Sequence, residues 1–312
     1  MVSALLYLAA MLAAGLSTSQ AGPSDGGRLS VAVAEPDIDS IVQAVGGDQV
    51  SSFSLFKECI LKNRLQVEPD AVHRLAKADA VVWTGYLKES AAIHAALSRF
   101  RPELPDISGR IEWINVSKGA TRVNVPTTTC YGYIDAGIAP GDPFFWLNPR
   151  NGSVIARNIA EGLGNLRPDK RDYFRANAEE FTKSLALDIN RWKQQLSPIA
   201  GLRIFATLCG WQNFTRLGGP RFIVCKKGPG SLPAPERLID QLRRMRAQIV
   251  VMDPDTQPEY ERAFREEPGF RVAKVPSSIG RIPGATTYSQ VFETMVESLL
   301  KSAEEALQSA KK

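Results

Sequence analysis

Two runs of alternating strand-like and helix-like segments, separated by a long helical stretch, are the feature that most limits the fold of this chain. Apolar stretches typical of buried strands occur at residues 29–34, 50–55, 80–83 and 111–116, and again at 203–206, 221–224, 248–252 and 271–275. Segments with helical spacing of apolar residues lie between them, beginning with residues 39–45. Strands that alternate with helices form parallel sheets covered by helices on both faces. The sequence therefore predicts two α/β units.

The stretch between the two runs is almost entirely helical. Residues 150–196 carry helix signals that are broken only near Arg167 and Pro168. The second part, from Asp169 to Leu196, would be about 42 Å long at the standard rise per residue. We therefore predict an α/β fold of two parallel-sheet lobes joined by a long interlobe helix. The expected boundaries are 28–165 for the N-terminal lobe, 166–199 for the linking helix and 200–312 for the C-terminal lobe.

The N-terminal segment has the pattern of a secretory signal. An apolar run from Ala4 to Ala14 is followed by Ser19-Gln20-Ala21, a small-x-small pattern typical of a cleavage site. Residues 1–21 are therefore predicted to be a signal peptide, and the mature chain is expected to be exported to the periplasm. No later segment has the length of uncharged apolar sequence that a membrane span requires.

The charge composition argues against nucleic acid as a partner. The chain of 312 residues has 38 Lys and Arg against 33 Asp and Glu, with a formal net charge of +5. The basic residues are scattered among the acidic ones, without the clustered basic stripe of a nucleic-acid-binding protein. We therefore expect no nucleic-acid partner.

The two histidines do not support a catalytic site. His73 and His94 fall within predicted helices of the first lobe, where exposed helical histidines are the simpler interpretation. Because both histidines fall within these helices, no Ser/His/Asp or Cys/His arrangement is indicated. No phosphate-binding loop occurs either. We expect that the protein is not an enzyme.

Several motifs follow one another in a fixed order along the mature chain. They are Ile41-Val42-Gln43-Ala44-Val45-Gly46-Gly47-Asp48, the run from Pro69 to Trp83, Gly141-Asp142-Pro143-Phe144-Phe145-Trp146-Leu147-Asn148-Pro149, Tyr173-x-x-x-Asn177-Ala178-x-x-Phe181, and Leu187-Asp188. In this order and spacing the chain resembles the periplasmic solute-binding proteins of zinc and manganese ABC importers. The resemblance implies a monomer with small hinge motions, a small solute or metal ion as ligand, and an ABC permease in the inner membrane as partner.

The same resemblance implies a site in which most metal ligands are replaced. The family usually holds its ion with three histidines and one carboxylate. In this sequence the four positions correspond to Asn63, Phe144, Ala206 (or Thr207) and Asp253. Only Asp253 keeps a ligand side chain, and zinc prefers nitrogen and sulfur donors. We expect Phe144 and Asp253 to face one cleft from opposite lobes, in a lining made of Asn63, Tyr131, Phe144, Ala206, Trp211 and Asp253.

The four cysteines fall in or beside loops that face the cleft in the implied fold. They are Cys59, Cys130, Cys209 and Cys225, and no C-x-x-C motif occurs. One interpretation is one or two structural disulfides, with Cys209 and Cys225 as the pair that strand end and helix start would bring together. The alternative is a thiolate site for a soft ion such as Cu(I). Both interpretations remain open.

A third interpretation replaces the cation by an anion. Basic residues in predicted loops at the ligand end of the lobes are Lys57, Arg64, Lys226, Lys227 and Arg281, and residues 228–231 offer exposed backbone amides. Such groups suit an oxyanion or an anionic metal chelate. Aromatic residues near the cleft, among them Tyr131 and Trp211, would suit a larger organic ligand.

Two functions are consistent with these patterns. The first is an exported solute-binding protein of a metal-type ABC importer with an atypical site for a metal ion, a metal chelate or another solute. A transition-metal ion would then be the transported ligand and not a resident cofactor. The alternative is a periplasmic accessory or partner protein on the same fold that has lost solute binding.

Overall fold

The fold is given by a computed structural model. It describes residues 27–56, 67–85, 87–100, 111–122, 144–207, 210–224, 232–254, 256–275 and 278–309. The predicted signal peptide lies outside these residues. Within the described ranges, no helix is both long enough and apolar enough to cross a membrane.

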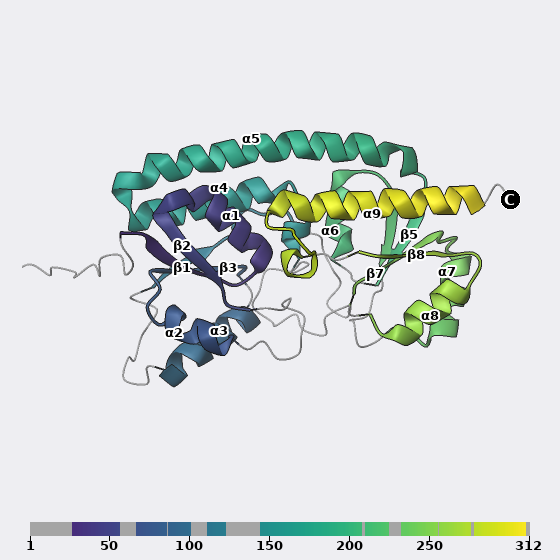
Figure 1. The fold of residues 1–312 in the computed structure, drawn as a ribbon, viewed down its shortest axis with the longest axis horizontal. Coiled ribbons are helices and arrows are strands. Elements are labelled where there is room, and N and C mark those ends of the chain that lie inside the picture. Colours follow the sequence, from purple (N-terminus) through teal and green to yellow (C-terminus); the bar gives the residue numbers. More distant parts are fainter. Residues whose placement is uncertain are drawn as a thin grey trace, which may run out of the picture.

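The first lobe is a four-stranded parallel sheet with helices on both faces. Its strands are β1 (Leu29–Val33), β2 (Val50–Ser54), β3 (Ala80–Trp83) and β4 (Glu112–Asn115), in the order β2-β1-β3-β4. Its helices are α1 (Pro36–Gly46), α2 (Pro69–Leu75) and α3 (Leu87–Phe100), with the 3-10 turn η1 at Gly47–Gln49. Figure 1 shows α1 on one face of this sheet, and α2 and α3 on the other.

Helix α1 begins three residues earlier than the apolar spacing predicts. Pro36 occupies the start of the helix, where a proline is favoured because its missing N–H would have no helical partner anyway. Asp37 therefore lies in the first turn of α1, where a carboxylate is favourable beside the free N–H groups of the helix start.

The second lobe repeats the topology of the first. Strands β5 (Arg203–Ala206), β6 (Arg221–Val224), β7 (Ile249–Met252) and β8 (Arg271–Lys274) form a parallel sheet in the order β6-β5-β7-β8. Its helices are α6 (Trp211–Phe214), α7 (Pro235–Arg244), α8 (Pro258–Glu266) and α9 (Tyr288–Ser309), with 3-10 turns η6 (Thr215–Leu217) and η7 (Ile279–Arg281). The two sheets confirm the prediction of two parallel-sheet lobes.

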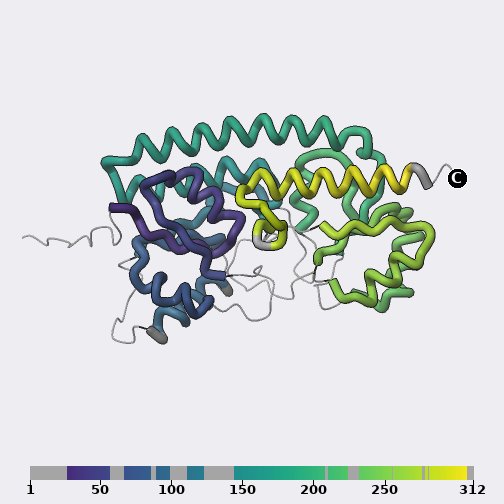
Figure 2. Tube along the Cα trace, viewed as in Figure 1, coloured from purple at the N-terminus to yellow at the C-terminus, as the bar shows by residue number. Residues whose placement is uncertain are grey.

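A pair of helices connects the lobes. The 3-10 turn η3 (Phe145–Leu147) leads into α4 (Asn151–Leu166), and η4 (Pro168–Lys170) separates α4 from α5 (Arg171–Leu196), a helix of 26 residues that ends in η5 (Ser197–Ile199). The break falls at Pro168, as predicted. Figure 1 shows α5 running alongside both lobes, and Figure 2 shows α9 lying along it in the second lobe.

The two lobes share one hydrophobic core on the side of α5. Alternate residues of a strand point to opposite faces of its sheet, and in β1 Val31 and Val33 join the shared cluster whereas Ala32 joins a separate cluster beneath α2 and α3. A third cluster fills the corresponding space beneath α7 and α8. The shared cluster includes Trp192 of α5 and Phe292 of α9, whose rings stack with centroids 5.2 Å apart. The packing on this side therefore links the two sheets directly.

Candidate functional site

The carboxyl ends of the central strands mark where a site is expected in each lobe. In open parallel sheets, ligands bind outside these ends at the point where the strand order reverses. That point lies between β1 and β3 in the first lobe and between β5 and β7 in the second. The residues that follow these strands include Glu35, Thr84, Thr207 and Asp253.

Asp253, the one residue predicted to keep a ligand side chain, is paired with an arginine. The Arg281 guanidinium donates from Nη1 to Asp253 Oδ1 at 2.6 Å, and the two side chains are 21% and 16% exposed. The Asp253 backbone N–H donates to Thr207 Oγ1 at 3.2 Å, and Thr207 Oγ1 lies 3.1 Å from Thr256 Oγ1. Because the guanidinium already compensates the carboxylate, a cation at Asp253 would have to displace Arg281 or share the carboxylate with it.

Phe144 fills the position that the resemblance gives to a histidine ligand. Its side chain is only 2% exposed, and its ring packs edge-on against Trp146 with centroids 5.4 Å apart. Gly210 of the second lobe lies directly against it, because a Cβ added to Gly210 would come within 2.9 Å of the Phe144 ring. The contact between the lobes at this point is therefore apolar and closely packed.

Two further residues of the expected lining are enclosed in the core. Ala206 and Trp211 are both fully buried, and the Trp211 ring stacks on Phe222 with centroids 5.3 Å apart. As the lobes stand, these two side chains and Phe144 are therefore closed to a solute.

A buried carboxylate missing from the sequence-based site joins the two lobes. Asp37 is 1% exposed, and its Oδ1 accepts a hydrogen bond from the Ile279 backbone N–H at 2.7 Å. Its Oδ2 accepts from Trp146 Nε1 at 3.1 Å, while the Tyr288 hydroxyl donates to the Trp146 carbonyl. Burial raises the pKa of Asp37 to about 6, although the hydrogen bonds from Ile279, Trp146 and Ser278 oppose that rise.

Two other buried carboxylates lie near the strand ends of the first lobe. Glu35 directly follows the apolar run of β1 and is 2% exposed. Glu89 at the start of α3 is fully buried and accepts from both the Thr84 backbone N–H, at 2.9 Å, and the Thr84 hydroxyl, at 2.5 Å. The signal in the sequence was Glu35-Pro36-Asp37, two acids directly after a buried strand, which the motif comparison did not use.

The remaining predicted site residues lie outside the described part of the chain. They are Asn63, Tyr131, the four cysteines Cys59, Cys130, Cys209 and Cys225, and the basic residues Lys57, Arg64, Lys226 and Lys227. The disulfide and thiolate interpretations therefore stay predictions. Among the residues that are described, no group of three or more His, Cys, Asp or Glu side chains is placed to hold a metal ion.

The histidines lie where the sequence predicts. His73 on α2 and His94 on α3 are both exposed, and the His94 ring stacks on Trp113 with centroids 4.8 Å apart. His94 Nδ1 also lies 2.7 Å from the Ser90 carbonyl of its own helix. The prediction of exposed helical histidines is confirmed.

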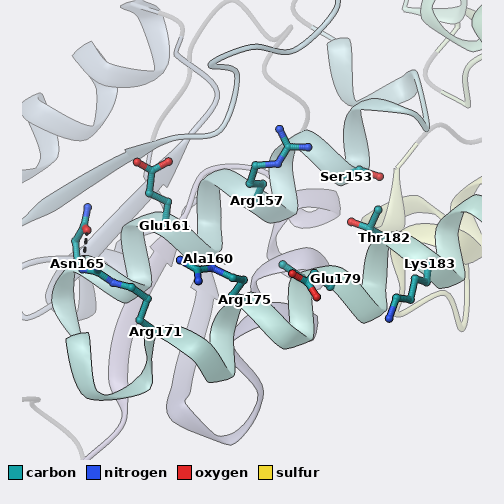
Figure 3. A pocket seen from close by; sticks show the side chains of 11 residues that line it. Ser153, Arg157, Ala160, Glu161, Asn165, Arg171, Arg175, Glu179, Thr182 and Lys183 are labelled. Atoms are coloured by element: carbon teal, nitrogen blue, oxygen red, sulfur yellow. Dashed lines mark hydrogen bonds between the residues drawn. The ribbon is translucent and has the colours of Figure 1, made fainter.

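A groove of about 730 Å³ lies away from the strand ends, between α4 and α5. Figure 3 shows its lining, which is Ser153, Arg157, Ala160, Glu161, Asn165, Arg171, Arg175, Ala178, Glu179, Thr182 and Lys183. Arg171 is already engaged with the Gly164 carbonyl, at 3.2 Å, and Arg175 with Asp172, at 3.6 Å. None of the lining residues follows a strand, so the groove is not part of the candidate site.

Two lobes of the same parallel topology, spanned by one long helix and meeting at their strand ends, define a class of two-lobed solute-binding folds. The chain belongs to the family described as zinc-uptake complex component A, periplasmic, whose profile matches residues 31–302. This match confirms the resemblance drawn from the motifs. The family's description is that of an uptake component, which agrees with the expectation that the chain is not an enzyme.

Individual relatives support the same assignment at low identity. The chain is similar to the manganese ABC transporter substrate-binding lipoprotein PsaA of Streptococcus pneumoniae, with 22% identity over 183 residues, 58% of this chain and 56% of the relative. It is also similar to the high-affinity zinc uptake system protein ZnuA of Brucella abortus, with 23% identity over 164 residues, 51% of this chain and 49% of the relative. The chain thus matches about half the length of these curated relatives.

Among solved structures the similarity covers more of the chain than it does among the curated relatives. A crystal structure of ZnuA superposes with a TM-score of 0.71 at 19% sequence identity, covering 88% of this chain and 99% of that one. At this identity the similarity establishes the two-lobed fold and not the identity of a ligand.

Proposed function

We propose that the protein is an exported, periplasmic solute-binding component of a metal-type ABC importer, with an atypical site, and that it delivers its solute to an inner-membrane permease. Membership of the zinc-uptake family supports the general role. The substrate-binding names of the relatives support a transported ligand. The candidate solutes are a metal ion, a metal chelate or another solute.

The observation that carries the atypical site is the ion pair between Arg281 and Asp253, at 2.6 Å. The guanidinium places a positive charge beside the Asp253 carboxylate. A metal ion bound to that carboxylate would bring a second positive charge to the same place. Like charges at short range repel, and a partly buried site screens that repulsion less than bulk water does. Packing of Phe144 against Gly210 further supports a site without the usual nitrogen ligand at that position.

Zinc and manganese should bind this protein weakly. We expect dissociation constants above about 1 µM, which corresponds to less than roughly 8 kcal/mol of binding free energy. Titration calorimetry on chelator-stripped, thiol-blocked mature protein measures this directly, with a histidine-bearing zinc-binding relative as positive control. Nanomolar zinc binding by the stripped protein would refute the atypical site.

The second candidate function is an accessory protein that has lost solute binding. The same two observations favour it, because Arg281 already compensates the Asp253 carboxylate within the second lobe and the Phe144–Gly210 contact packs the lobes together without any solute. Native mass spectrometry of protein purified from its own periplasm separates the two functions. A stoichiometric bound mass supports transport, and a consistently empty protein that still associates with a membrane partner supports the accessory role.

Finer features of the proposal follow from the sequence. We propose a cleaved signal peptide at residues 1–21, lobes at 28–165 and 200–312 with the linking helix at 166–199, and a monomeric mature protein. Cys209 and Cys225 are proposed to form a disulfide in the oxidising periplasm. Mass mapping without reductant would show this crosslink, whereas readily alkylated thiols protected by Cu(I) would favour the thiolate site instead.

A further inference from the structure

A short segment between β8 and α9 is held by both lobes at once. This segment, Ser278–Ile282, is called the strap here and contains η7. Figure 2 shows it between the two lobes, at the foot of α9. The strap binds the first lobe through Asp37 and the second lobe through Asp253.

The contact with the first lobe is made by the Ile279 backbone N–H, and the Ser278 side chain adds a hydrogen bond to the same carboxylate. Asp37 Oδ1 accepts from the Ile279 N–H at 2.7 Å, across 242 positions of sequence. Hydrogen bonds to an ionised acceptor are about twice as strong as neutral ones, and Asp37 is 1% exposed, so water does not compete for it. Trp146 Nε1 occupies the other carboxylate oxygen, which orients the Asp37 side chain.

The contact with the second lobe is made two residues further on by a side chain. Within the strap, the Arg281 N–H donates to the Ser278 carbonyl at 3.0 Å and the Ile282 N–H donates to the Ile279 carbonyl at 3.2 Å. These bonds make the strap a single compact turn. Holding the Ile279 backbone therefore also fixes the direction from which Arg281 reaches Asp253.

We propose that Asp37 is a positioning residue of the solute site, which holds the strap so that Arg281 stays on Asp253. That the site affected is a solute site rests on the function proposed above. The position of the Arg281 guanidinium then depends, through the strap, on the contact between the lobes at Asp37. Separation of the lobes at Asp37 releases the Arg281 guanidinium from its fixed position and makes the Asp253 carboxylate accessible to a solute.

Labelling of arginines with phenylglyoxal, followed by mass mapping, measures how firmly Arg281 is held. Arg167 is a matched internal reference, because its side chain is 22% exposed and pairs with Asp169 at 3.1 Å, far from the strap. An Asp253→Asn variant gives the labelling rate of Arg281 without its partner. All measurements use the full mature protein without added solute.

The decisive comparison is Ile279→Pro against Ile279→Ala. Proline removes the N–H that Asp37 accepts, at the first position of a 3-10 turn, where proline is tolerated. Ser278 before it is extended, at φ −154° and ψ 149°, which suits a residue preceding proline. Alanine removes a similar part of the side chain and keeps the N–H. We expect proline, but not alanine, to raise the Arg281 labelling rate about fivefold, toward the rate of Asp253→Asn, with Arg167 unchanged.

An Asp37→Ala variant tests the same contact from the other side. It should raise Arg281 labelling as Ile279→Pro does; if it fails to fold, the two Ile279 variants decide alone. Arg281 rates that agree within about twofold between Ile279→Pro and Ile279→Ala would overturn the proposal. Equal acceleration of Arg281 and Arg167 would also overturn it, because that pattern indicates general loosening. Since the assay contains no solute, a protein that is consistently empty in native mass spectrometry would reject the proposed transport function while leaving this result unaffected.

Discussion

At the residue scale, three side chains decide what the meeting point of the lobes can bind. Arg281 neutralises Asp253, and Phe144 closes the position expected for a nitrogen ligand. Asp37 contributes differently, since it is buried, charged at neutral pH and bound to groups from other elements. Burying an ionised carboxylate opposes folding unless hydrogen bonds compensate it, so Asp37 makes stability depend on pH.

The contribution of Asp37 to stability should be largest in acid. Its pKa is about 6 in the folded protein against 3.8 for an ordinary aspartate. A raised folded pKa stabilises the protein fully below the unfolded value, and this stabilisation is lost as the pH rises through the folded value. The unfolding free energy of the wild type, relative to Asp37→Asn, should therefore fall by about 2 kcal/mol between about pH 4.5 and about pH 7.5.

Urea unfolding of both proteins across this pH range measures the difference. Tyr288 on α9 is an ionisable group close to Asp37, Glu35 and Asp39 lie two residues from it in the sequence, and all three are shared by the two proteins. Burial and the nearby Asp37 charge raise the pKa of Tyr288 well above its usual value, so it stays neutral throughout. A difference that does not change with pH would show that Asp37 does not titrate in this range.

At the scale of elements, close packing of α4 against its neighbours depends on small residues. Gly152 in the first turn of α4 faces α5 and α9, and a Cβ there would lie 2.6 Å from Leu185 and 2.8 Å from Tyr288. Gly164 in the last turn of the same helix faces Arg171, which supplies the three atoms nearest to an added Cβ, with its Cγ at 3.1 Å. The two glycines share a helix but differ in what surrounds them, which makes them a matched pair.

Gly152→Ala should destabilise the protein, whereas Gly164→Ala should not. Overpacking a core contact costs about 1–3 kcal/mol, and the gain in helix propensity from glycine to alanine recovers at most about 1 kcal/mol. Arg171 can move aside at the cost of its hydrogen bond to the Gly164 carbonyl, and the helix gain offsets that loss. Chemical unfolding at one pH measures both changes, and equal stability of the two variants would contradict the packing argument.

At the scale of the whole molecule, the shared core joins two lobes, each of which has its own four-stranded sheet. One cluster includes Val31 and Ile114 from the first sheet and Ile249 and Val251 from the second, together with α5 and α9. The outer clusters, in contrast, are confined to one lobe each. Residues packed in one core lose their contacts together, so this arrangement favours cooperative unfolding of both lobes.

The mature protein should unfold in one calorimetric transition. Ile93→Ala in the outer cluster of the first lobe and Phe264→Ala in that of the second, each costing about 2–5 kcal/mol, should both lower the temperature of the same single transition. Scanning calorimetry of the three proteins tests this through the ratio of calorimetric to van't Hoff enthalpy. Two resolved transitions, each sensitive to only one substitution, would show that the lobes unfold independently.

The sequence by itself determined the two α/β lobes, the long helix and the break at Pro168. Apolar periodicity and proline geometry are properties of short segments, and they appear in the chain before any long-range contact forms. Ordered motifs also identified the family, and through it the special position of Asp253. The apolar spacing, however, predicted that α1 begins at residue 39. Asp37 was therefore placed outside the helix and outside the site.

Only the tertiary structure decided which side chains meet. In three pairs, nothing close to either residue in the sequence specifies its partner. The pairs are Asp37 with Ile279, Arg281 with Asp253, and Phe144 with Gly210. The first and third pairs depend on how the two sheets are set against each other by a helix and a shared core, whereas Arg281 meets Asp253 within the second lobe. The sequence could therefore predict that the usual metal ligands are replaced, but the arginine on the Asp253 carboxylate followed only from the fold of the second lobe.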